Sequence, residues 1–241
     1  MSDTQADDIT VRLNAAAELM RRILQQSYER MHLAPGQRVL DVGCGAGADT
    51  LAMARVIGAS GIVHGVDYDA AMILQATLGA RTENAAAWVI YRHANATALP
   101  WPDDYFNATR SDRVFQTLLD PERAFDELLR VTQPDGYVLV ISGDWDSLSI
   151  DSDGSDLESR RDYFAATRAT NNPLSAQCLS RLFAQHGMLD VQIDLRPRFC
   201  MADSAAACWQ LSIAPEAASS GLFASANVVM ISGRKPPISA A

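Results

Sequence analysis

The chain has 241 residues, a formal net charge of −9 and 48% apolar residues. This is the composition of a folded globular protein with a full hydrophobic core, and it excludes a disordered chain. The acidic balance argues against a nucleic-acid or anionic-membrane partner, because phosphate groups are bound by clustered Lys and Arg.

The cysteine pattern and the N-terminal sequence indicate a cytoplasmic protein. Cys44, Cys178, Cys200 and Cys208 form neither a CxxC pair nor a zinc-ligand spacing. The first residues, MSDTQADD, are polar and acidic, unlike a signal or transit peptide. No apolar run approaches the roughly 18–20 residues of a membrane span. We therefore expect reduced thiols, no membrane partner and no metal site, and the oligomeric state stays open.

The predicted elements begin with an amphipathic helix over residues 10–31, which Ala34-Pro35-Gly36 ends. Strands and helices then alternate over residues 38–42, 48–57, 62–66, 70–80, 88–92 and 107–110. Asp120 is the expected N-cap of the next helix, with Pro121 at its first position. A turn at Pro134–Gly136 is expected to precede a strand over 137–141. A helix over 174–186 and strands over 191–195 and 226–232 complete the series.

This alternation predicts an α/β fold with a Rossmann-like, mostly parallel seven-stranded sheet. Strands that are apolar throughout are typical of a sheet covered by helices on both faces. The last strand follows without a clear crossover, so we expect it to be antiparallel. Residues 1–241 are interpreted as one domain, with an N-terminal cap helix (1–34), a lid-like insertion (143–173) and a frayed tail (235–241).

The strongest motif is VLDVGCGAG at residues 39–47, between a predicted strand and a predicted helix. Glycines there allow a sharp turn and a close approach of the backbone to a ligand. Asp67 follows at the end of the next strand, where a carboxylate can accept two hydrogen bonds from a ribose diol. An ordinary turn, a helix-capping Asp67 and a GxGxxA dinucleotide loop are the alternatives.

Further blocks give the segment from Arg38 to Val140 a family resemblance. These are GIVHGVDYDAAM (61–72), ALPWPDDYFN (98–107) and DPERAFDELLRVTQPDGYVLV (120–140). With the glycine motif they resemble the class I S-adenosylmethionine-dependent methyltransferases, in the small-molecule branch related to the quinone C-methyltransferases. The resemblance implies S-adenosyl-L-methionine as cofactor. It also implies cofactor contacts for Asp41, Gly43, Cys44, Gly45, Asp67, Tyr68, Met72, Asn95, Ala96, Arg110 and Ser111.

Three residues depart from the family pattern. Asn95 replaces the acidic residue that contacts the adenine amino group, and its amide oxygen can still accept a hydrogen bond there. Asn107 replaces an acidic residue after the strand-four phenylalanine. Thr117 stands where many relatives have histidine, so no catalytic base is assigned.

The predicted function is methyl transfer to an O, N or C nucleophile of a small planar metabolite, of the kind found in secondary metabolism. The acceptor is expected beyond the carboxyl ends of strands four and five. The candidate acceptor residues there are Arg113, Phe115, Gln116, Asp144 and Trp145. The alternatives are a cofactor-binding member repurposed for a rearrangement or a structural role, and an NAD-dependent oxidoreductase.

Overall fold

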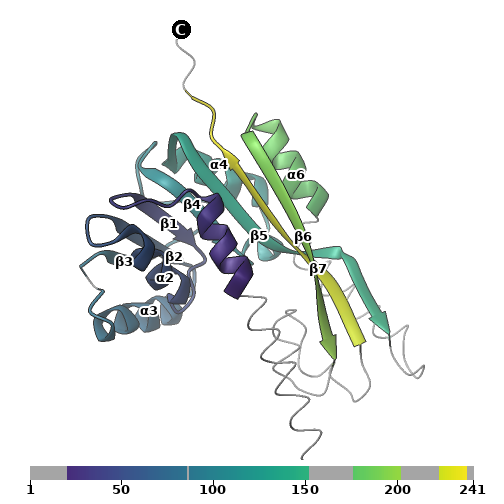
Figure 1. Cartoon of the computed structure of the whole chain (residues 1–241), viewed down its shortest axis with the longest axis horizontal. Helices are drawn as coiled ribbons and strands as arrows, with labels where there is room; N and C mark the ends of the chain where they lie inside the picture. The colour runs from purple at the N-terminus through teal and green to yellow at the C-terminus, as the bar shows by residue number, and fades with distance from the viewer. Residues whose placement is uncertain (1–20, 86, 152–175, 202–222, 238–241) are drawn as a thin grey trace, which may run out of the picture.

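The computed structural model describes residues 21–85, 87–151, 176–201 and 223–237, and its seven strands form one sheet (Figure 1). The strands are β1 (Arg38–Val42), β2 (Ile62–Asp67), β3 (Val89–His93), β4 (Phe106–Asp112), β5 (Thr132–Asp151), β6 (Leu189–Met201) and β7 (Phe223–Arg234). Their order across the sheet is β3-β2-β1-β4-β5-β7-β6, and β7 runs antiparallel to β5 and β6. The predicted fold class is confirmed.

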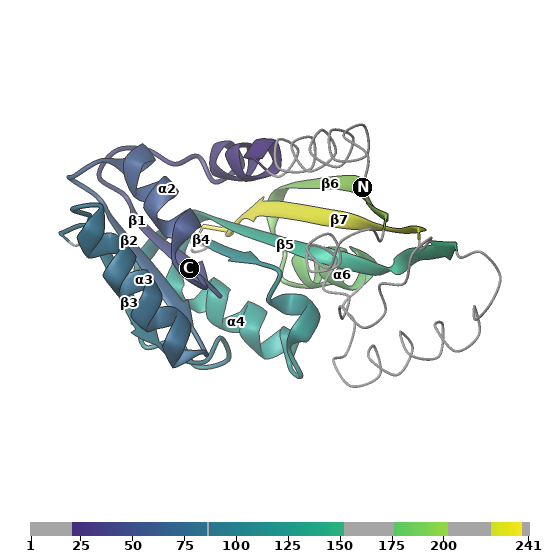
Figure 2. The same cartoon turned by 90° about the horizontal axis from the view of Figure 1, so that it is seen from below.

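Helices cover both faces of this sheet. They are α2 (Ala48–Ile57), α3 (Ala70–Thr82), α4 (Pro121–Val131), α6 (Ala176–Gln185) and an N-terminal helix over residues 21–30. The N-terminal helix and α2 lie on one side of the sheet, and α4 and α6 lie on the other (Figure 2). Asp120 caps α4 as predicted, because its side chain accepts from the backbone N–H of Arg123 at 3.0 Å.

The covered sheet explains why its central strands are apolar at successive positions. Successive side chains of a strand point to opposite faces. Leu40 of β1 therefore packs in the core under α4 and α6, while Val39 packs in the core under the N-terminal helix and α2. In β5, Val140 likewise packs in the core under α4 and α6, and Leu139 packs in the core under the N-terminal helix and α2. Each such residue is fully buried, so both cores stabilise the sheet.

Strand β5 differs from its prediction at both ends. The turn expected at Pro134–Gly136 is instead an irregular stretch inside β5, where the register with β4 shifts between Phe106 and Ala108. Residues 143–151, assigned above to the lid-like insertion, extend β5 and pair with β7. The rest of that insertion (152–173), the start of the first helix (10–20) and the end of the tail (238–241) lie outside the described residues.

Candidate functional site

The glycine loop between β1 and α2 is tied to the neighbouring strand β2. The backbone N–H of Gly43 donates to the carbonyl of Val66 at 2.7 Å. Gly43 and Gly45 have φ values of 78° and 51°, which glycine adopts without a Cβ penalty. A Cβ on Gly43 would lie 1.9 Å from Cγ2 of Val114, whereas a Cβ on Gly45 would have no heavy atom within 4 Å. Gly43 thus serves packing, and Gly45 faces open space.

Asp67 lies at the end of β2 and joins the glycine loop to the start of α3. Its Oδ2 accepts from the backbone N–H of Gly45 at 2.8 Å, and its Oδ1 accepts from that of Asp69 at 2.9 Å. Asp69 is the N-cap of α3, since its side chain accepts from the N–H of Ala71. The carboxylate of Asp67 is therefore held at the edge of the loop and does not itself cap the helix.

A cavity of about 470 Å³ opens beside this loop. It brings together residues of the predicted cofactor site with the predicted acceptor residue Arg113. The lining residues are Val42, Gly43, Asp67, Tyr68, Ala94, Asn95, Ala96, Asp112, Arg113, Val114, Thr117 and Leu118. Because they end or directly follow β1, β2, β3 and β4, the cavity lies at the carboxyl edge of the parallel strands, where ligands of open α/β sheets bind.

The end of the cavity near β3 carries the residues predicted to contact adenine. Tyr68 is 78% exposed, and the centroid of its ring lies 6.1 Å from that of the His93 ring. Met72 is half-buried in the first turn of α3 and is not among the lining residues. Asn95 Oδ1 already accepts from the backbone N–H of Thr97 at 3.0 Å, so a single lone pair of this oxygen is left for a ligand.

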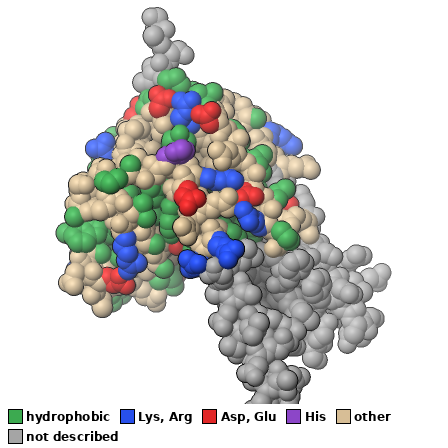
Figure 3. All heavy atoms as spheres, in the orientation of Figure 1, with side chains coloured by type: hydrophobic (Ala, Val, Ile, Leu, Met, Phe, Trp, Pro, Cys, Tyr) green, Lys and Arg blue, Asp and Glu red, His purple; other side chains and the backbone are tan. Residues whose placement is uncertain are grey.

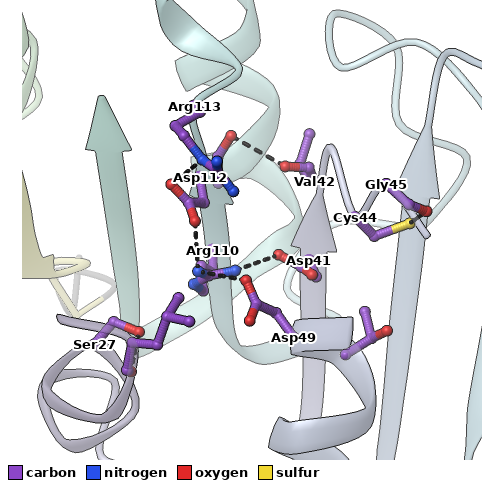
Figure 4. Close-up of polar contacts among 12 residues, drawn as sticks. Ser27, Asp41, Val42, Cys44, Gly45, Asp49, Arg110, Asp112 and Arg113 are labelled. Atoms are coloured by element: carbon purple, nitrogen blue, oxygen red, sulfur yellow. Dashed lines mark hydrogen bonds and ion pairs between the residues drawn. The ribbon is translucent and has the colours of Figure 1, made fainter. Parts of the chain in front are cut away.

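Charged side chains cluster around the buried Arg110 (Figure 4), and one of them, Asp112, also lines the cavity. Arg110, within β4, places Nη1 3.0 Å from Asp41 Oδ1. Its Nη2 lies 3.0 Å from Asp49 Oδ2 and 3.1 Å from Asp112 Oδ2. Arg110 and Ser111 were expected just past the strand, offering backbone groups to the cofactor. Both are inside β4, where they pair with β1, and this expectation is corrected.

Burial sets the ionisation of Asp41. Removal from water raises the pKa of this carboxyl to about 7; the Arg110 guanidinium opposes the rise, and the charges of Asp49 and Asp112 add to it. Within the described part of the chain, Asp41 Oδ2 has no hydrogen-bond partner. A buried acceptor of this kind suits an N–H donor of a ligand, directly or through water.

Most of the other predicted contacts do not line the cavity. Phe115 is fully buried and packs on Phe125, and Cys44 is buried beside Gly65. Gln116 Oε1 accepts from the N–H of Gly143 at 2.7 Å. Asp144 is buried in β5. Trp145 is also in β5, and its side chain lies outside the described residues.

Asp49 and Asp112 were missed by the sequence reasoning. Asp112 follows Arg110 by two residues, so both side chains lie on one face of β4. Charged residues at two buried positions of one strand were the available signal, because charges are rarely buried unless they are paired.

Charges of both signs are interspersed on the face of the molecule in Figure 3. Over the described ranges, no three His, Cys, Asp or Glu side chains are grouped so that they could hold a metal ion. The helices of those same ranges are too short or too polar to cross a membrane.

The strand order, the glycine loop after β1 and the acid ending β2 occur together, as the motifs of residues 38–140 predict for a class I S-adenosylmethionine-dependent methyltransferase domain. Residues 40–140 match the family described as a methyltransferase domain. The resemblance inferred from the motifs, and with it the class of cofactor, is thereby confirmed.

Relatives of this chain support the same class. An uncharacterized 37.1 kDa protein in a transposon of Streptomyces fradiae is 34% identical over 175 residues, which cover 72% of this chain and 49% of that protein. The ubiquinone/menaquinone biosynthesis C-methyltransferase UbiE of Vibrio campbellii is 36% identical over 107 residues, 44% of this chain and 41% of that enzyme. The chain thus spans about half the length, or less, of these relatives.

Solved structures share the fold. The YcgJ protein of Bacillus subtilis superposes with a TM-score of 0.68 at 20% identity, over 90% of this chain and 99% of that one. This likeness concerns the arrangement of strands and helices.

Proposed function

We propose that this protein binds S-adenosyl-L-methionine in the cavity beside the glycine loop and transfers its methyl group to a small molecule. The bound cofactor supplies a methyl group on a cationic sulfonium, and transfer leaves the bonding electron pair on sulfur, giving the neutral thioether S-adenosylhomocysteine. The observation that carries the proposal is the joint placement of Asp67 and Gly45, hydrogen-bonded at 2.8 Å, where a Cβ on Gly45 would meet no protein atom.

The residues around the cavity fit the chemical groups of this cofactor. Asp67 would accept hydrogen bonds from the ribose hydroxyls, since a carboxylate can accept at both oxygens. Tyr68 offers a flat surface to adenine. The unpaired Oδ2 of Asp41 would accept from the methionyl ammonium, directly or through water. These assignments follow the family resemblance and the observed positions together.

The acceptor side of the cavity favours a small planar metabolite. Arg113 lines it with a side chain that is 49% exposed, and its Nε lies 3.3 Å from Asp112 Oδ1. A guanidinium can stack on a flat conjugated ring or pair with its oxygen atoms. The relatives named as quinone C-methyltransferases support an acceptor of this kind. We retain the cytoplasm and secondary metabolism as the expected setting.

Holding the cofactor and the acceptor close together would supply much of the rate acceleration of methyl transfer. Thr117 lines the cavity at the point where many relatives carry histidine, and no histidine is among the lining residues. The chain's own contribution is then to orient both reactants and to exclude water. This replacement also favours the second candidate, a cofactor-binding member repurposed for a rearrangement or a structural role.

Two measurements test the proposal. Calorimetry should show binding of S-adenosylhomocysteine and no binding of NAD, which would exclude the oxidoreductase. Methyl-labelled cofactor incubated with a panel of quinones, phenols and other planar acceptors should then transfer its label. Failure to bind S-adenosylhomocysteine would overturn the proposal, while binding without transfer across the panel would favour the repurposed member.

For the acceptor, Arg113→Ala and Trp145→Ala should each lower kcat/KM about tenfold while leaving cofactor affinity nearly unchanged. An unaltered kcat/KM in both variants would place the acceptor elsewhere.

A further inference from the structure

The border strand β6 carries an apolar stripe that is half uncovered. Strand β6 ends the sheet order, so among the described strands it pairs with β7 alone (Figure 1). Val191, Ile193 and Leu195 form the stripe, and they are 40%, 50% and 51% exposed. Alternate residues of a strand share one face, so the three side chains present one apolar row at the edge of the sheet.

The stripe extends a buried core beyond the helices that cover it. Ile193 lies opposite Ile231 of β7, which is fully buried in the core under α4 and α6. On the other face of β6, Asp194 pairs with Arg30 of the N-terminal helix at 3.5 Å. The strand is therefore held from one side, and covering its apolar side would remove further surface from water.

The outer edge of β6 offers backbone hydrogen-bonding groups at the residues of the stripe. Pro197 has no N–H, and Asn227, which lies opposite it in β7, donates its N–H to Ser147 Oγ of β5 at 2.7 Å. Pro197 and Asn227 are therefore a pair without mutual hydrogen bonds, and such pairs alternate with bonded ones along antiparallel strands. Ile193 and Leu195 come at alternate positions before Pro197, so their N–H and C=O groups point outward, away from β7.

The middle of this edge lacks the usual protections. Proteins block exposed sheet edges with bulges, proline or lysine. In β6 a bulge lies at one end, where the register with β7 shifts between Leu189 and Gln192, and Pro197 lies at the other. Residues 192–196 contain neither proline nor lysine, so another strand can pair there.

The sequence of β6 is complementary to a second copy of itself in one register. In an antiparallel pair centred on Ile193, the two stripes meet and Gln192 faces Asp194, whose carboxylate can accept from the amide. The neighbouring registers that keep both stripes on one face are centred on Asp194 or on Gln192. The first sets Asp194 opposite itself and the second sets Asp194 opposite Asp190, and like charges directly opposite each other destabilise a sheet.

We propose that two copies of this chain associate through β6, antiparallel and centred on Ile193, so that their sheets join across a two-fold axis. The outward N–H and C=O groups of Ile193 bond those of Ile193 in the second copy, and the two apolar stripes pack side by side. No residue of β6 lines the cavity, so the association leaves the proposed cofactor site open.

Sedimentation velocity on the full chain, over a concentration series, measures this association. The wild type should form a dimer. Ile193→Lys sets two ammonium groups against each other at the centre of the interface, so it should raise the dimer dissociation constant at least about tenfold. Leu78→Lys is the matched control, because Leu78 of α3 is 53% exposed and lies outside β6. It should dimerise as the wild type does. If Ile193→Lys fails to fold, Leu195→Lys decides.

A cysteine at the centre tests the register. In Ile193→Cys the two thiols face each other across the axis, at the roughly 5.5 Å Cα–Cα separation of a hydrogen-bonded pair, which a disulfide can span. Mild thiol oxidation should give a covalent dimer on a non-reducing gel. The wild type, with its own four cysteines, and Leu78→Cys should give none.

A wild type that stays monomeric over the whole series would overturn this inference. A dimer that both lysine variants of β6 leave intact, or that Ile193→Cys fails to cross-link, would overturn it as well. None of these outcomes affects the proposed function, because binding of S-adenosylhomocysteine is measured separately and should be equal in Ile193→Lys and the wild type.

Discussion

Asp67 contributes to the site through both of its oxygens. Its two oxygens accept from the backbone N–H groups of Gly45 and Asp69, so the fold itself orients the carboxylate. A preoriented acceptor spends less conformational entropy on binding.

Replacement of this carboxylate tests its role. Asp67→Ala should weaken binding of S-adenosylhomocysteine by about 1.5–3 kcal/mol, because charge-assisted bonds to the ribose diol are lost. Isothermal calorimetry measures the change. Asp69→Ala is the control, since it removes the cap of α3 and leaves the bond from Gly45 in place. Equal affinity in Asp67→Ala and wild type would remove Asp67 from the site.

Two glycines of the loop should respond differently to a side chain. Gly45→Val should abolish cofactor binding, because its side chain would enter the open space that the ligand is proposed to occupy. Most of the fold should be retained, because the side chain meets no protein atom there and the positive φ costs only about 1–2 kcal/mol. Gly43→Ala should destabilise the protein through its clash with Val114. Calorimetry and chemical denaturation separate the two effects.

The double variant Gly43→Ala/Val114→Ala should regain part of the stability lost by Gly43→Ala, because the clashing Cγ2 is removed. Normal cofactor binding by Gly45→Val would show that the ligand lies elsewhere.

At the scale of the element, β2 carries a buried histidine in an aromatic setting. His64 is 4% exposed, and its ring meets those of Trp101 and Phe106 edge-on, each with centroids 5.4 Å away. Neither ring nitrogen has a hydrogen-bond partner among the described residues. Burial lowers the pKa of His64 to about 4, and the charges of Arg92 and Arg38 act in the same direction.

This histidine should make the fold sensitive to acid. A base whose pKa is lower in the folded than in the unfolded chain binds fewer protons when folded, so its contribution is complete above pH 6.5 and is lost as the pH falls toward 4. His64→Phe keeps an aromatic ring and should remove this loss, which is on the order of 3 kcal/mol at most. Urea denaturation at pH 7 and pH 4.5 measures the free energy of unfolding of the wild type and of His64→Phe. An equal decrease of this free energy in both proteins between the two pH values would contradict the assignment.

At the scale of the whole molecule, the N-terminal helix links the candidate site to the far edge of the sheet. The hydroxyl of Tyr28 donates to Asp49 Oδ1 at 3.3 Å, which connects the helix to the buried cluster. Arg196 of β6 donates to Gln26 Oε1 at 2.9 Å. If the cofactor binds in the adjacent cavity as proposed, these contacts would couple its binding to the position of this helix.

We predict that residues 10–31, together with the part of the insertion that follows β5 (152–173), close over the bound ligands, since lids in such enzymes exclude water. Hydrogen exchange with and without S-adenosylhomocysteine should show protection in both segments. Peptides from α4, on the opposite face of the sheet, are the control. Tyr28→Phe should reduce the protection of the N-terminal segment, and equal exchange in both states would contradict closure.

The sequence by itself determined the local elements and the loop of the site. Strand β1 and helix α2 were predicted at their observed bounds, because apolar periodicity and glycine signals act over a few residues. The approach of Asp67 to the glycine loop was also predictable. It follows from the parallel pairing of β1 with β2, in which Val42 lies opposite Val66.

Only the tertiary structure determined which residues meet in the ion cluster and how far β5 extends. Arg110 and Asp41 are 69 residues apart, and they meet because β1 and β4 pair in one register, in which a shift of one residue would turn Arg110 to the other face. The continuation of β5 through residues 143–151 likewise depends on its partner β7. Contacts of this kind depend on the register in which strands from distant segments pair, and local sequence patterns do not predict that register.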